Sequence, residues 1–211
     1  ILKLATLAYS KGFYYKPTID MQLLFENSKD VIVFSGCYSG FFQQMLLHGE
    51  ISAAIKIAAE FKEALGEDYY LETQQYPIFL NTIDQFTYVT KHLDIPVVLT
   101  CDPHFQTPDQ ASYQEVLHSI RDRREFDESR IIREGYQWPA DELFEAVKTL
   151  FPSLEWETIF ENVNRIADSC SVEMPTGSVP RFPMSEEDDA KDLLFQLCAE
   201  GVKTRGLNTL S

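Results

Sequence analysis

The chain has 211 residues, of which 45% are apolar and 27 are aromatic (15 Phe, 10 Tyr and 2 Trp), enough for one large domain or one domain with a small extension. Its formal net charge of −15 argues against a piece that grips nucleic acid by itself, because phosphate binding needs clustered lysines and arginines. No apolar run reaches the length of a membrane span, and the four scattered cysteines predict free thiols in a reducing cytoplasm rather than a disulfide framework.

The first residues predict a helix that is already under way. Ile1, Leu4, Ala5 and Ala8 recur at helical spacing, and no capping residue stands ahead of them. We therefore expect the chain to be a piece cut from a longer protein.

Three buried strands alternate with helices in the first 130 residues. Strands are predicted at 31–35, 69–74 and 95–101, from β-branched or aromatic runs bounded by turn residues. Helices are predicted after Gly40, over 51–65 with an end at Gly66, and after an N-cap at Asn81. This order is typical of an α/β protein with a parallel sheet, and three strands in about 120 residues resemble part of a (β/α) barrel rather than a closed one.

A fourth helix follows a capping box at Thr107-Pro108-Asp109-Gln110. Helical spacing predicts that one apolar face of this helix points inward, formed by Tyr113, Val116, Leu117 and Ile120.

The pattern becomes helical after residue 130. Two amphipathic helices are predicted, the first around Leu143–Leu150 and the second around Trp156–Ile166. A proline-containing stretch with Pro175, Pro180 and Pro183 then reads as a linker, and Ser185 opens a capping pattern before a last helix. We divide the chain accordingly into 1–130, a helical segment 131–170, and a linker with its helix 171–211.

The run from Ile95 to Phe105 contains the most informative chemistry. Asp102 and His104 follow a strand and are two residues apart, so an extended backbone across Pro103 would place both side chains on one side. A carboxylate and an imidazole at the carboxyl end of a strand can hold a divalent metal. The alternative is a turn with a solvated aspartate and an unrelated histidine.

Several segments, taken in order, resemble one family: the bacterial and phage DNA polymerase III alpha subunits, at their polymerase-and-histidinol-phosphatase (PHP) domain and its join to the polymerase body. The matching stretches are Leu7–Pro17 with Ile19-Asp20, Phe34–Gly40, Tyr69–Gln74, Ile95–Phe105, Val179–Pro183 and the helix Leu193–Arg205.

The resemblance implies a partial, distorted PHP barrel followed by a helical extension. In the family the barrel holds divalent metals such as zinc or manganese. The resemblance therefore implies metal ligands at Cys37, Asp102 and His104. For Cys37 alone, a small buried apolar residue is the alternative. Two departures stand against a complete site: Gln75-Tyr76 occupies the place of a frequent Asp-His pair, and the opening His-x-His motif of the family is absent from the chain.

The functions that follow form three alternatives. The first is a fragment of a replicative DNA polymerase, whose palm, with its magnesium, lies outside this chain and whose PHP part supplies either 3′–5′ exonuclease proofreading or structural support. In that case DNA is bound through the intact polymerase, and other replisome subunits are candidate partners. The second is a stand-alone PHP phosphoesterase, and the third a non-catalytic interaction module.

Overall fold

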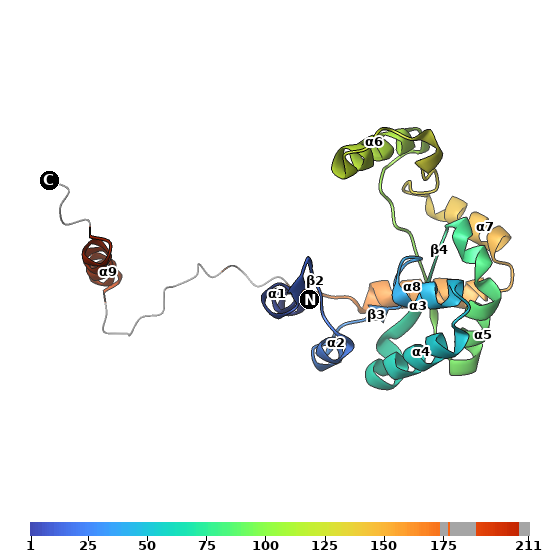
Figure 1. Ribbon diagram of the computed structural model, residues 1–211. Helices are drawn as coiled ribbons and strands as arrows, with labels where there is room; N and C mark the ends of the chain where they lie inside the picture. The colour runs from blue at the N-terminus through green and yellow to red at the C-terminus, as the bar shows by residue number, and fades with distance from the viewer. Residues whose placement is uncertain (174–176, 178–188, 207–211) are drawn as a thin grey trace. The chain divides into compact units, whose positions relative to one another are not determined.

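The computed structural model describes residues 1–173, 177 and 189–206, and its elements are labelled in Figure 1. The chain divides into two compact units, Ile1–Ser171 and Val172–Ser211. In the second unit, α9 (Ala190–Thr204) begins after Asp189, whose carboxylate accepts hydrogen bonds from the backbone N–H groups of Lys191 and Asp192. The predicted linker prolines and the predicted cap at Ser185 lie outside the described residues. The division at residue 130 stays a prediction.

A three-stranded parallel sheet forms the centre of the first unit. It consists of β3 (Val33–Phe34), β4 (Tyr69–Gln74) and β5 (Val97–Thr100), in the order β3-β4-β5. Every residue of β4 is buried, as expected for a strand covered on both faces. The α/β class is therefore confirmed, and closure into part of a barrel remains a prediction.

Helices connect the parallel strands. Between β3 and β4 lie α3 (Phe41–Leu47) and α4 (Ile51–Leu65), and α5 (Ile83–Leu93) joins β4 to β5. Helix α4 ends as predicted at Gly66, where a φ of +60° suits a residue without a Cβ. Helix α5 starts one residue later than predicted, because Asn81 closes the short 3₁₀ segment Pro77–Asn81 and Thr82 takes the N-cap position.

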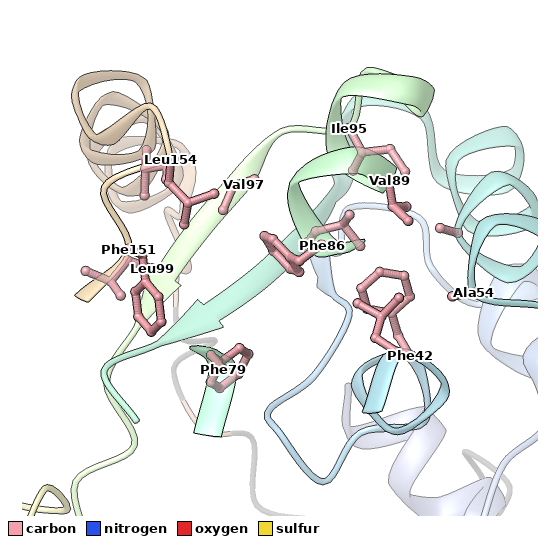
Figure 2. Close-up of a cluster of buried hydrophobic side chains, with 14 of the residues drawn as sticks. Phe42, Ala54, Phe79, Phe86, Val89, Ile95, Val97, Leu99, Phe151 and Leu154 are labelled. Carbon is pink, nitrogen blue, oxygen red and sulfur yellow. The ribbon is translucent and has the colours of Figure 1, made fainter. Parts of the chain in front are cut away.

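The core lies on both sides of β5. Figure 2 shows Phe86 and Val89 of α5 near Phe42 and Ala54, and the ring centroids of Phe42 and Phe86 are 6.3 Å apart. The other side is closed by α7 (Ala140–Leu150) and α8 (Trp156–Ser169), both of which the sequence predicts. Asn162 of α8 donates from Nδ2 to the Val97 carbonyl at 2.8 Å, so α8 is hydrogen-bonded to β5.

A small hairpin motif precedes the sheet. Helix α1 (Leu2–Lys11) leads into β1 (Phe13–Tyr14) and β2 (Lys16–Pro17), which pair antiparallel, and α2 (Met21–Glu26) follows with Asp20 as its N-cap. The Asp20 carboxylate accepts from the Leu23 backbone N–H at 2.8 Å, which satisfies one of the free donors at the start of α2.

The orientation predicted for the fourth helix is wrong. Its capping box and the 3₁₀ turn Pro108–Gln110 are present, and α6 (Ala111–Asp122) follows, but the apolar residues expected inside are exposed: Tyr113, Val116, Leu117 and Ile120.

The buried face of α6 is polar instead, and an ion pair explains it. The guanidinium of Arg124 donates to the buried carboxylate of Glu115, at 3.0 Å for the Nη2–Oε2 pair. Chiefly through this hydrogen bond, Arg124 lowers the pKa of Glu115 to about 2. Ser119 donates to the same carboxylate, and the turn ending at η4 (Glu128–Arg130) closes over it through the Asp127 backbone N–H.

The two-sided core predicts how substitutions on α5 will behave. Phe86→Ala removes a ring that is 1% exposed and should lower the free energy of unfolding by about 3–5 kcal/mol. Tyr88→Ala, on the exposed side of the same helix, should cost less than about 1 kcal/mol. Urea unfolding of the full chain measures both values, and equal losses would contradict the assigned core.

Candidate functional site

The carboxyl ends of the three parallel strands bring the candidate residues to one edge of the sheet. Cys37 lies in the turn after β3, Tyr76 follows β4, and Asp102 and His104 follow β5. Parallel strands end on the same edge, which is where α/β proteins place their ligand sites.

Asp102 and His104 meet as the sequence predicts. Oδ2 of Asp102 lies 3.5 Å from Nε2 of His104, and about half of each side chain is exposed. Strand β5 ends at Thr100, so the two residues stand in the loop that follows it. The backbone N–H of His104 donates to the Gly135 carbonyl at 2.8 Å, and an isolated bridge pairs Phe105 with Tyr136, which fixes this loop against the segment before α7.

Cys37 has a different neighbour. Its Sγ lies 3.0 Å from the Ser39 hydroxyl within the same turn, and the thiol is half-buried. Among the residues that the structure describes, no three His, Cys, Asp or Glu side chains come together as a metal-binding group. The assignment of Cys37, Asp102 and His104 as ligands therefore remains a prediction.

The donor set present does not fit a complete catalytic metal centre. Such a zinc centre takes three protein ligands, and only the Asp102–His104 pair is assembled within the described parts of the chain. We therefore derive no metal-dependent step from these residues.

Tyr76 ties the loops of this edge together. Its hydroxyl donates to the Asp102 backbone carbonyl at 3.0 Å, and its ring meets that of Tyr38 edge-on, with centroids 6.0 Å apart. Burial, aided by the nearby Asp102, raises the pKa of Tyr76 to about 12. The phenol is therefore neutral near pH 7 and acts as a hydrogen-bond donor to the Asp102 carbonyl.

Sequence reasoning missed Glu72, a buried carboxyl in the central strand. Its carboxylate accepts from the hydroxyl of Thr100 and from Nε2 of Gln74, the latter at 3.2 Å. The Ser35 hydroxyl in turn accepts from the backbone N–H of Glu72 at 2.9 Å. The available signal was a glutamate inside a strand predicted to be buried. Glutamates are almost never fully buried unless they are paired, so its position indicates hydrogen-bonding partners.

Burial raises the pKa of Glu72 above its ordinary value of 4.5, outweighing hydrogen bonds from Thr100, Gly36 and Gln74 that lower it. The Asp102 charge raises it further. This carboxyl is the only one in the described residues with a resolved upward shift, and it lies next to the candidate edge. Perturbed carboxyls of this kind are common at functional sites.

Comparison with known protein families first identifies the class of domain. Residues 1–76 match the model of the PHP domain, a stretch that includes Cys37 and Tyr76 and ends before Asp102 and His104. The chain therefore carries part of a PHP domain.

Curated proteins that match nearly the whole chain then show which PHP-containing proteins it is similar to. The chain is 31% identical to DNA polymerase III subunit alpha of Deinococcus radiodurans over 96% of its length, and 28% identical to that of Thermus aquaticus over 97%. It is also 28% identical to DNA polymerase III subunit alpha of Borreliella burgdorferi, a match that covers 100% of this chain. The predicted resemblance to DNA polymerase III alpha subunits is confirmed. The chain spans 16–19% of the length of these relatives.

The raised pKa of Glu72 predicts a pH-dependent cost to folding. A carboxyl that binds its proton more tightly in the folded chain favours folding below its ordinary pKa of 4.5, and that contribution is lost as the pH rises through the raised folded-state value. Glu72→Gln should therefore reduce the loss of stability between about pH 5 and about pH 8. Urea unfolding at both pH values measures the effect in wild type and variant.

Glu60→Gln serves as the control, because Glu60 is a half-exposed partner of Lys56 on α4. An identical pH dependence in wild type and Glu72→Gln would show that Glu72 is not perturbed by burial.

Proposed function

We propose that this chain is a region of a replicative DNA polymerase of the DNA polymerase III alpha type, acting in the cytoplasm. In this proposal residues 1–130 form the carboxyl-terminal part of a barrel-like PHP domain, 131–170 a helical segment, and 171–211 a linker and helix leading toward the polymerase body. The observation that carries it is similarity to these subunits over 96–100% of the chain. Such similarity beyond the PHP match at residue 76 disfavours a stand-alone phosphoesterase.

The contribution of this chain is structural support rather than exonuclease chemistry. Tyr76 stands where many family members have a histidine, and its neutral hydroxyl is used to hold the Asp102 backbone. The loops after β3, β4 and β5 are thus joined through Tyr38, Tyr76 and Asp102. DNA synthesis, with magnesium in the palm, and contacts with other replisome subunits belong to the whole polymerase.

Asp102 and His104 are in this proposal two ligands of a divalent zinc or manganese centre, with Cys37 as a third by resemblance. What supports the pair is its 3.5 Å separation and its solvent access, which leaves room for an ion and its waters.

The ligand assignment predicts weak metal binding that depends on this pair. Zinc or manganese retained by the purified chain after gel filtration should be below one ion per chain and should fall further in Asp102→Ala/His104→Ala. Tyr76→His restores an imidazole beside Asp102 and should increase retained zinc, whereas Tyr76→Phe should not. Elemental analysis of the eluted protein gives these values.

The matched control is Asp84→Ala/His92→Ala, which removes the same residue types from exposed positions on α5. Equal metal content in the wild type, the control and Asp102→Ala/His104→Ala would remove the ligand assignment.

If the role of this chain is structural, the purified chain should be inactive in DNA synthesis, in exonuclease proofreading and in phosphate ester hydrolysis. It should neither extend a primer, nor release nucleotides from a 3′-labelled strand, nor hydrolyse a phosphate monoester, with zinc, manganese or magnesium added. Release of 3′ nucleotides that is lost in Asp102→Ala/His104→Ala would favour proofreading over support. Monoester hydrolysis lost in that variant would instead favour a stand-alone phosphoesterase.

A further inference from the structure

The first nineteen residues expose an unusual cluster of aromatic side chains. Tyr14 is 79% exposed and Tyr15 85%, and the nearby Tyr9 and Phe13 are 66% and 58% exposed. The rings of Tyr14 and Tyr15 meet edge-on with centroids 4.6 Å apart, and those of Tyr9 and Phe13 stack at 6.2 Å. Exposed aromatic rings that lie together in this way are typical of binding surfaces.

The backbone holds these rings in place before any ligand arrives. Strands β1 and β2 pair Tyr14 with Lys16, and Tyr15 turns the hairpin with a φ of +58°, which is rare for a bulky residue. Gly12 closes the base: a Cβ there would lie 1.9 Å from the Thr18 carbonyl oxygen, and the Thr18 backbone N–H donates to the Gly12 carbonyl at 3.1 Å. Strained backbone of this sort is found preferentially where a chain clamps a ligand.

The charge of this segment is opposite to that of the rest of the chain. Residues 1–19 contain three lysines and no acidic residue, a formal charge of +3, whereas residues 20–211 carry −18. The excess acid that argues against nucleic-acid binding therefore lies entirely after residue 19. Lys16 is directly opposite Tyr14 in the antiparallel pair, so the ammonium and the ring share one face of the hairpin.

We propose that this hairpin and the adjoining end of α1 bind single-stranded DNA. Unpaired bases stack on the exposed faces of Tyr14 and Tyr15, and Lys11 and Lys16 lie beside the phosphates. Aromatic platforms with neighbouring cations are the usual means of binding a single strand without sequence preference, and duplex bases are already stacked on one another. The aromatic and basic groups would suit any single-stranded nucleic acid. Only the choice of DNA over RNA rests on the proposed function.

The three lysines of residues 1–19, which have no acidic residue among them, favour a phosphate-bearing strand over a peptide as the ligand. A proline-rich peptide also docks on aromatic surfaces, but it carries no charge that calls for this local excess of cations.

Fluorescence anisotropy of labelled oligo(dT) with the full chain, in low salt and EDTA, tests the proposal. Tyr14→Ala/Tyr15→Gly should weaken binding at least about fivefold, because stacking on one ring contributes about that factor or more. Tyr15→Gly alone removes one ring while relaxing the positive φ, so weakened binding by this variant cannot be ascribed to unfolding. Tyr113→Ala, which removes an exposed tyrosine on α6, should leave the affinity unchanged.

The electrostatic part is tested by the salt dependence of the same binding. Lys11→Gln/Lys16→Gln should reduce the slope of log K against log salt by about 0.7 for each lysine that contacts a phosphate. Lys56→Gln, at an exposed position on α4, should not change it.

Absence of binding at the lowest salt, or equal affinity for wild type and Tyr14→Ala/Tyr15→Gly, would overturn the proposal. Tighter binding of a proline-rich peptide than of oligo(dT) at the same tyrosines would replace it with a peptide-docking surface. Because the assay contains EDTA and needs no catalysis, its failure leaves the proposed polymerase region and the metal assignment untouched.

Discussion

The candidate site depends on the parallel pairing of β3, β4 and β5. Val33 and Phe34 lie beside Tyr69 and Tyr70, and Leu71–Gln74 lie beside Val97–Thr100. This register places three loops that are far apart in the sequence at one edge. A shift of one residue in β4 would reverse which face each of its side chains occupies and would take the Glu72 carboxylate away from the Thr100 hydroxyl. Glu72, Tyr76 and the Asp102–His104 pair become neighbours only because this register holds.

That edge combines the features of a binding site with those of a structural joint. The Asp102–His104 pair is accessible and polar, and the raised pKa of Glu72 adds a perturbed carboxyl beside it. Tyr76, in contrast, is buried and neutral, and its hydroxyl is committed to the Asp102 carbonyl. This hydrogen bond holds the loops that follow β4 and β5 together. It is the physical basis of the proposed structural role.

The apolar surfaces of the first unit show where local periodicity is an incomplete guide. Both α6 and α8 carry apolar residues at helical spacing, yet α8 buries Trp156 and Ile159 whereas α6 exposes its apolar stripe. The difference arises from Glu115, whose carboxylate is held by Arg124, Ser119 and the Asp127 backbone N–H. A buried ion pair whose partners stand nine residues apart cannot be read from helical spacing, because it needs the turn after the helix to fold back.

The sequence by itself determined the α/β class, the three strands, most helix boundaries and the nearness of Asp102 to His104, since these depend on local periodicity, capping and short separations. Its motifs also predicted the resemblance to DNA polymerase III alpha subunits. Only the tertiary structure decided that Tyr76 bonds to Asp102, that Glu72 is buried beside Thr100, and that the apolar face of α6 is exposed. Each of these rests on contacts between segments from nine to 28 residues apart, which the packing of the strands and the closure of turns establish.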